Sequence, residues 1–209
     1  MSERTRMAQH VPLLQKKFSK REFKLMQGFY RFVDHVHPHV RTRAEALGVK
    51  QGQTVVDYGC GPGRYAVEFA RLVGSEGKVI AVDLVEIALS ETRKRMEGAG
   101  LTNYELVLAH EYDTGIADNT ADKVCAIDMF HHVADTNAFL REARRIAKSD
   151  ALLIFSGGHM LRKRLKSKVA ESGMWELAEE RTEFIAYKVH VHAQTIHEHR
   201  HRHDDELLP

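Results

Sequence analysis

Short apolar runs alternate with amphipathic segments through the middle of the chain. The runs are rich in β-branched and aromatic residues and are short enough to be buried strands. The segments between them carry apolar residues every three or four positions, as helices that cover a sheet do. The predicted strands are 53–58, 78–83, 104–109, 121–128 and 151–157, and the predicted helices are 64–74, 85–100 and 137–148. This alternation predicts an α/β fold with a mostly parallel sheet and helices on both faces.

The two ends of the chain follow other patterns. Residues 1–50 are expected to be helical, because apolar side chains such as Met26 and Tyr30 recur near the helical period. After Gly158 we expect a basic helix over 160–172 and two strands that pair antiparallel. From His190 the chain has six histidines and few apolar residues, so it is expected to be disordered. The predicted parts are an N-terminal helical segment (1–40), an α/β domain (41–189) and a tail (190–209).

Composition predicts a cytoplasmic protein. The chain has 209 residues, of which 43% are apolar, enough for one sizeable core. No apolar stretch approaches the ~18 residues of a membrane span, and the polar N-terminus lacks the apolar segment of a signal peptide. The two cysteines, Cys60 and Cys125, give no disulfide framework, which favours a reducing compartment.

Charge is nearly balanced, but basic residues gather in two places. The net charge of +2 gives little support to general nucleic-acid binding. The basic clusters are 15–24 and 161–168. Each is either a solvated helix face or part of a rim that attracts an anionic substrate.

A glycine-rich turn follows the first predicted strand. Gly59 to Gly63 hold three glycines and a proline in five residues, and Asp57 precedes them, giving D-x-G-x-G-x-G. A strand, a glycine turn and a helix in this order present backbone N–H groups and a helix N-terminus to a ligand. The spacing is not the G-x-G-x-x-G of dinucleotide-binding proteins, and a P-loop would have Lys-Ser or Lys-Thr where Arg64 and Tyr65 stand. We expect a nucleotide-like cofactor of another kind.

Asp83 supports the same interpretation. It ends the second predicted strand, 20 residues after Gly63, where a carboxylate can accept hydrogen bonds from both ribose hydroxyls of a nucleoside. The alternative is that Asp83 only caps the helix that follows it. Together with the glycine turn, the cofactor role is favoured.

These residues and the segment "FHHVADTNAFLREARRIAKSDALLIFSGG" (130–158) resemble class I S-adenosylmethionine-dependent methyltransferases, over about residues 40–189. The resemblance implies a Rossmann-like, seven-stranded sheet in the order 3-2-1-4-5-7-6 with strand 7 antiparallel. It also implies S-adenosylmethionine as cofactor and S-adenosylhomocysteine as product. The implied cofactor residues are Asp57, Gly59, Cys60, Gly61, Pro62, Gly63, Asp83, Leu84, His110, Glu111, Asp128 and Met129.

Within this set, the glycines and the pair Asp128 and Met129 are implied to lie beside the methionyl part, and Leu84 to pack on the adenine. One position departs from the family. Many relatives end strand three with a Gly-Asp pair whose Asp binds the adenine amino group, whereas Ala109-His110-Glu111 stands here. Either Glu111 replaces that acceptor, or His110 stacks on or bonds to the base.

Methyl transfer from a sulfonium needs positioning above all, and a base only when the acceptor must lose a proton. His131, His132 and His159 follow predicted strands and are the candidate catalytic residues, although each could instead bond to backbone or cap a helix. The resemblance suggests residues 1–40 as a lid, with Tyr30, His35 and His37 as candidate substrate contacts. A metal site formed by this histidine cluster and His159 is conceivable but has no supporting ligand spacing, so no metal is predicted.

A methyltransferase acting on a small molecule is the favoured function, in a monomer or homodimer. A second class is an RNA or protein methyltransferase that uses the basic helix 161–168 as its contact surface. No N-P-P-Y or D-P-P-Y motif follows strand four, which disfavours methylation of amino groups on nucleic-acid bases or glutamine. A third class is a regulator that binds S-adenosylmethionine without chemistry. A fourth, disfavoured by the glycine spacing, is a nicotinamide dehydrogenase.

Overall fold

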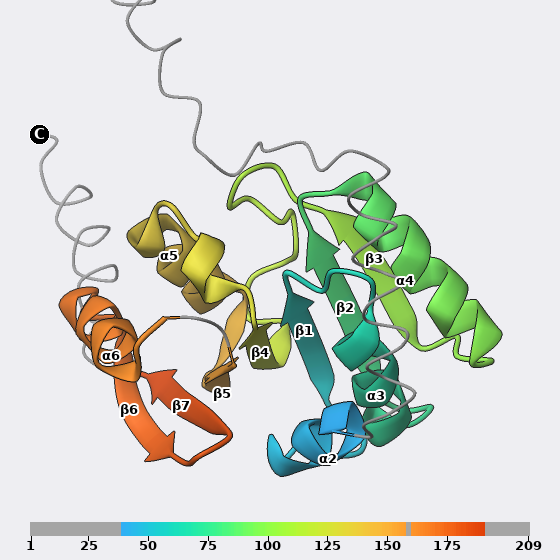
Figure 1. Cartoon of the computed structure of the whole chain (residues 1–209), viewed down its shortest axis with the longest axis horizontal. Helices are drawn as coiled ribbons and strands as arrows, with labels where there is room; N and C mark the ends of the chain where they lie inside the picture. The colour runs from blue at the N-terminus through green and yellow to red at the C-terminus, as the bar shows by residue number, and fades with distance from the viewer. Residues whose placement is uncertain (1–38, 158–159, 191–209) are drawn as a thin grey trace, which may run out of the picture.

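One seven-stranded sheet organises the protein (Figure 1). The computed structural model describes residues 39–157 and 160–190. The strands lie in the order β3-β2-β1-β4-β5-β7-β6, with β7 antiparallel to both of its neighbours, so the predicted fold class and strand order are confirmed. The strands are β1 (Thr54–Tyr58), β2 (Lys78–Asp83), β3 (Tyr104–Leu108), β4 (Ala121–Ile127), β5 (Ala147–Ser156), β6 (Trp175–Glu180) and β7 (Phe184–Val189).

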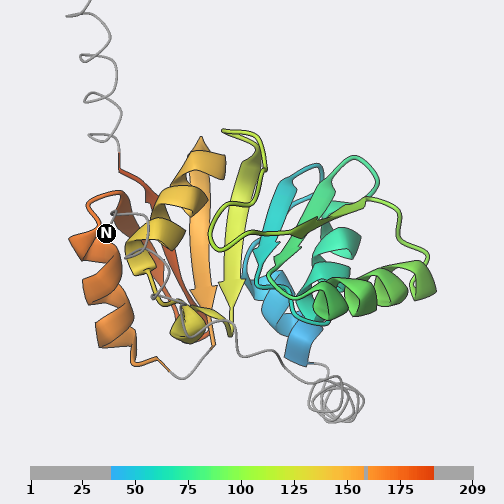
Figure 2. The same ribbon diagram turned by 90° about the horizontal axis from the view of Figure 1, so that it is seen from above.

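Helices cover both faces of the sheet (Figure 2). One apolar core packs side chains of α2, α3 and α4 against the sheet, and the other packs α5 and α6 against the opposite face. The helices are α2 (His39–Ala46), α3 (Arg64–Val73), α4 (Glu86–Gly98), α5 (Thr136–Ile146) and α6 (Arg162–Glu171), with a short 3-10 helix η4 (Phe130–His132).

The helix α3 shows why the sequence folds this way locally. Its buried residues Ala66, Phe69, Ala70 and Val73 follow the helical period, and Phe69 is fully buried. Burying such an aromatic side chain contributes about 1.5–3 kcal/mol. The helix ends before Gly74, whose φ of 67° suits glycine.

Two features of the fold differ from the predictions or lie beyond them. β5 begins at Ala147 rather than 151, because Ala147 pairs with Ala121 across an irregularity in the β4–β5 ladder. Residues 1–38 of the predicted lid and 191–209 of the predicted tail lie outside the described residues, as do Tyr30, His35, His37 and His159.

The connection from β3 to β4 has an unusual form. In the sheet, β2 and β1 lie between these two parallel strands, so the chain must cross over both. Such crossovers commonly contain a helix, but residues 109–120 contain none. This segment, which we call the crossover loop, begins at the edge of the sheet where β1, β2 and β4 also end.

Candidate functional site

A cavity of about 270 Å³ lies at the carboxyl ends of the parallel strands. Ligands of open α/β sheets bind at this edge. Ten of the twelve predicted cofactor residues line the cavity: Asp57, Gly59, Cys60, Gly61, Pro62, Asp83, Leu84, Glu111, Asp128 and Met129. Gly63 and His110 are not among the lining residues.

The glycine turn uses its own N–H groups. Gly59 and Cys60 both donate to the carbonyl of Val82, at 2.8 and 2.9 Å, and Gly63 donates to the carbonyl of Cys60 at 3.0 Å. The Gly61 N–H donates to the Asp83 carboxylate at 2.9 Å. The N–H groups of Gly59, Cys60 and Gly61 are thus bonded to β2, and that of Gly63 is bonded within the turn itself. A turn without available donors is poorly suited to a phosphate.

The three glycines of the turn have different surroundings. All have positive φ, a conformation that other residues adopt at a cost. A Cβ on Gly59 would lie 2.9 Å from the Met129 side chain, and one on Gly63 would lie 2.9 Å from the Cα of Thr92. A Cβ on Gly61 would meet nothing within 4 Å. Gly59 and Gly63 thus permit close packing, whereas Gly61 keeps one wall of the cavity open.

Asp83 ties β2 to the glycine turn. Besides the bond from Gly61, its carboxylate accepts the Val85 N–H at 2.9 Å. Val85, not Asp83, is the N-cap residue of α4, and it makes no side-chain cap bond. Burial raises the pKa of the Asp83 carboxyl, while the backbone N–H bonds oppose that shift.

Asp57 is a buried carboxyl at the floor of the site. Its side chain is 2% exposed, and its Oδ2 atom has no hydrogen-bond partner. Burial, with the nearby charge of Asp83, raises its pKa to about 7, although the Ala66 N–H bond lowers it. Because the atom without a partner belongs to a cavity-lining residue, a ligand donor or a cation would stabilise the ionised form.

We expect the stability of the ligand-free protein to fall as pH rises from about 4 to 7. The native Asp57 carboxyl binds its proton more tightly than the unfolded chain does, so raising the pH through this window favours unfolding. Between pH 5 and 8, the free energy of unfolding of the wild type should fall by on the order of 2 kcal/mol because of Asp57. The Asp57→Asn variant should lack this fall. Urea denaturation of both proteins at pH 5, 6, 7 and 8 measures the difference. Parallel pH profiles for the two proteins would contradict the assignment.

The end of β4 supplies another wall. Asp128 adopts a φ of 53°, which is uncommon for a residue other than glycine, and lies at the cavity with Met129 and His132. Of the two neighbouring histidines, only His132 lines this cavity. The half-buried His131 lines a separate small space between the ends of β4 and β5. Their ring centroids lie 3.9 Å apart, with the ring planes tilted by 42°.

The two residues predicted as alternatives for binding the base follow the end of β3. Glu111 lines the cavity and adopts a φ of 57°. His110 is exposed and pairs with Asp113 through reciprocal backbone hydrogen bonds of 2.9 and 3.0 Å. Both side chains are exposed, and of the two only Glu111 is among the residues that line the cavity.

Carboxylates dominate the charge of the cavity. Among the described residues that line it, Asp57, Asp83, Glu111 and Asp128 are acidic and Arg64 is the one Lys or Arg. Apolar side chains such as Leu84 supply much of the remaining wall. This combination suits a ligand with apolar surface, hydroxyl donors and positive charge.

Comparison with known proteins identifies the family. Residues 49–200 match the family model described as "Methyltransferase domain". The chain belongs to this methyltransferase family. The predicted resemblance is therefore confirmed, and S-adenosylmethionine is the cofactor that the family and its structural neighbours imply.

Individual relatives agree with this assignment. The Ubiquinone/menaquinone biosynthesis C-methyltransferase UbiE of Escherichia coli O1:K1 is 33% identical over 115 residues, 54% of this chain and 46% of that protein. The aligned part thus spans about half the length of the curated relative. Two solved structures share the fold. A SAM-dependent methyltransferase from Aquifex aeolicus has a TM-score of 0.64 at 23% identity, covering 70% of this chain and 87% of its own. A putative S-adenosyl-L-methionine-dependent methyltransferase from Methanococcus maripaludis has a TM-score of 0.70 at 22% identity, covering 84% and 94%.

Several residues of this methyltransferase site were missed from the sequence. Tyr65 and Tyr112 line the cavity, and Arg43 of α2 donates to the Tyr65 hydroxyl at 3.2 Å. Thr92 of α4 is fully buried and donates to the Gly61 carbonyl at 3.0 Å. A polar residue on the apolar face of α4 was a visible signal for Thr92. The contacts of Arg43 and Tyr112 depend on the tertiary structure and left no such signal.

Two further features concern metal binding and membrane insertion. No group of three or more His, Cys, Asp or Glu side chains that could hold a metal occurs in 39–157 and 160–190. Within the same ranges, no helix combines the length and apolar character needed to cross a bilayer.

Proposed function

We propose that the protein transfers a methyl group from S-adenosylmethionine to a small-molecule acceptor. One combination of features carries this proposal. The N–H groups of the glycine turn are already bonded within the protein, and the cavity beside the turn is rich in carboxylates. A pyrophosphate would meet carboxylates and few donors there. A nucleoside that carries a sulfonium and an ammonium group would find favourable charge.

Each part of the cofactor has suitable residues. Asp83 at the end of β2 is suited to accept the ribose hydroxyls, and Leu84 to pack on the adenine. Glu111 is the proposed acceptor for the adenine amino group. The open face of Gly61 admits the methionyl part, and the Asp57 oxygen without a partner is suited to its positive charge. Asp128 and Met129 complete this end of the cavity.

When bound, S-adenosylmethionine supplies an electrophilic methyl group on a positively charged sulfur. The protein then has to hold the acceptor in line and exclude water, which can supply most of the rate factor. His132 is exposed and lines the cavity, so it is the proposed group to take a proton from an acceptor that must lose one. His131 lines a different space and is not assigned this role.

Two observations favour a small acceptor over a macromolecule. The relative described above is named as a C-methyltransferase of ubiquinone and menaquinone biosynthesis, which concerns small molecules. On the basic helix α6, Arg162 and Lys166 lie 3.6 and 2.9 Å from the Glu180 carboxylate, so part of its charge is neutralised within the protein. The proposal keeps the predicted cytoplasmic location, the lid at 1–40 and a monomeric or homodimeric state.

Isothermal calorimetry with S-adenosylmethionine, S-adenosylhomocysteine and NAD tests the cofactor assignment. We expect micromolar dissociation constants for the first two and no binding of NAD. Acceptors can then be screened by release of S-adenosylhomocysteine. Silence with all three ligands would overturn the proposal, and binding without turnover on any quinol, phenol, amine or thiol would favour the regulator.

Asp83→Ala should weaken S-adenosylhomocysteine binding by roughly 10- to 100-fold, because hydrogen bonds to a charged group contribute on the order of 1.5–3 kcal/mol. The substitution also frees the Gly61 N–H. Calorimetry below the unfolding temperature measures the change, and Asp150→Ala, at an exposed carboxylate of β5, is the control. An affinity equal to that of the control would exclude the ribose role.

A further inference from the structure

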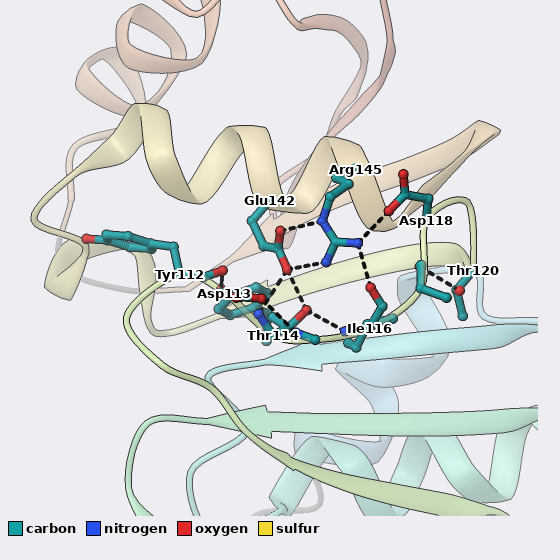
Figure 3. A network of polar contacts seen from close by, with 11 residues as sticks. Tyr112, Asp113, Thr114, Ile116, Asp118, Thr120, Glu142 and Arg145 are labelled. Carbon is teal, nitrogen blue, oxygen red and sulfur yellow. Dashed lines mark hydrogen bonds and ion pairs between the residues drawn. The ribbon is translucent and has the colours of Figure 1, made fainter.

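The crossover loop has backbone groups that no helix of its own satisfies. Buried N–H and C=O groups need partners, and a crossover helix would supply them internally. Here the helix α5, which packs on the same face of the sheet, supplies them instead (Figure 3). The Asn119 and Thr120 N–H groups donate to the carbonyls of Arg145 and Ile146 at its C-terminal end, at 3.0 and 2.8 Å.

Glu142 of α5 satisfies the middle of the crossover loop. Its Oε1 atom accepts the Thr114 N–H at 3.0 Å and the Thr114 hydroxyl at 2.5 Å. Thr114 is 6% exposed and Glu142 9% exposed, so this contact is buried. The Thr114 hydroxyl also accepts the Ile116 N–H at 3.2 Å, which extends the network by one more backbone group.

Arg145 joins Glu142 to the rest of the loop. Its guanidinium donates to both Glu142 oxygens, at 2.8 and 2.7 Å, and one nitrogen donates at 2.6 Å to the Ile116 carbonyl and to Asp118. Burial opposes ionisation of Glu142, but the bonds from Arg145 and Thr114 outweigh it and lower the pKa of its carboxyl. A paired charge whose two oxygens both accept hydrogen bonds is the arrangement that stabilises a buried carboxylate.

The other end of the loop reaches the cavity. Tyr112 lines it, its carbonyl accepts the Tyr58 hydroxyl at 3.2 Å, and its own hydroxyl accepts the N–H of Asp135, the N-cap of α5, at 2.8 Å. Glu111 lies beside Tyr112 in the strained backbone described above. The crossover loop is therefore held to both ends of α5. Glu111 and Tyr112 lie in the part of the loop that precedes Thr114 and borders the cavity.

We infer that Glu142 and Arg145 are positioning residues, which fix Glu111 and Tyr112 as the nucleoside-side wall of the cavity through Thr114 and Ile116. This inference rests on the proposed function, since it assigns the wall to the cofactor's nucleoside. Neither Glu142 nor Arg145 lines the cavity. The loop follows β3, which neighbours β2 and Asp83, so it serves the nucleoside rather than the methionyl end.

Two variants test the inference, each compared with a matched control. Glu142→Ala removes the carboxylate that Thr114 and Arg145 bind, and Glu142→Gln keeps its shape and one acceptor but loses its charge. The control is Lys94→Met, which breaks an i, i+3 ion pair of 2.7 Å with Glu91 on α4, away from the loop. Dissociation constants for S-adenosylhomocysteine and 5′-methylthioadenosine are measured by calorimetry well below each unfolding temperature. Hydrogen exchange of residues 109–120 is measured without ligand.

We expect Glu142→Ala to weaken both ligands equally, by roughly 3- to 30-fold, the range for residues that act on a site without touching it. Amide exchange in 109–120 should rise by about tenfold or more. Glu142→Gln should give a smaller change of the same kind, and Lys94→Met should resemble the wild type. If Glu142→Ala does not fold, Glu142→Gln decides the question by the same measurements.

The possible results distinguish a failure of the proposed function from a failure of the positioning role. Wild-type protein that binds neither ligand would overturn the proposed function, and this inference with it. Wild-type binding with unchanged affinity in both Glu142 variants would overturn only the positioning role, even if exchange in the loop increased. A loss for S-adenosylhomocysteine without a loss for 5′-methylthioadenosine would also overturn it, because the wall would then serve the methionyl end.

Discussion

Gly61→Val should weaken binding of S-adenosylhomocysteine at least about 100-fold, a loss of about 2.7 kcal/mol in binding free energy. A Cβ at this position meets no protein atom within 4 Å, so the valine side chain would project into space that the proposed ligand needs. The fold should survive, because the cost to stability is that of a strained backbone at φ 53°, roughly 1–3 kcal/mol. Calorimetry and thermal unfolding measure the two effects separately.

Gly100→Val is the control for this variant. Gly100 also has a positive φ, 68°, and open space around its Cβ position, but it follows α4 and does not line the cavity. We expect a similar loss of stability and no loss of affinity. If Gly61→Val binds S-adenosylhomocysteine as the control does, the glycine turn is not part of the cofactor site.

Gly63→Ala should destabilise the protein by about 3–5 kcal/mol, the sum of left-handed backbone strain and overpacking. The new Cβ would lie 2.7 Å from Thr92 side-chain atoms and 2.9 Å from the Thr92 Cα. A side chain can rotate away, but the Cα belongs to the helix α4, so the turn or the helix would have to shift. Urea denaturation monitored by circular dichroism measures the free energy of unfolding.

Gly52→Ala isolates the packing contribution. Gly52 has the same φ of 79° as Gly63, and a Cβ there meets nothing within 4 Å. Gly52→Ala should therefore be destabilised by backbone strain alone. The difference in the free energy of unfolding between the two variants, roughly 1–3 kcal/mol, is then the cost of crowding Thr92. Equal losses in both variants would contradict close packing between the turn and α4.

Gly61 and Gly63 show how a single glycine-rich motif meets two separate structural requirements. Gly61 lines the cavity and has space beside it, whereas Gly63 packs on Thr92 and does not line the cavity. Both appear in the sequence simply as a residue with backbone freedom. Their different roles depend on what lies about 30 residues away in the chain, on α4.

The sequence by itself determined the fold class, the strand order by resemblance, and nearly all of the regular elements. Periodicity and turn residues are local properties, and β2 occupies 78–83 as the pattern predicts. Most predicted cofactor residues also line one cavity, because the carboxyl ends of parallel strands meet at a single edge. The start of β5 at Ala147 was missed, since it depends on pairing with Ala121.

Only the tertiary structure decided which groups of the site are available. Within the glycine turn, the N–H groups of Gly59 and Cys60 are bonded to Val82 and that of Gly61 to Asp83, which no pattern within the turn reveals. That Glu111 lines the cavity and His110 does not depends on the path of the backbone after β3, and the anchoring of the crossover loop by Glu142 joins residues 28 positions apart. Hydrogen-bond partners and cavity walls are set by the packing of distant segments, and a single sequence specifies these through the whole fold rather than through local spacing.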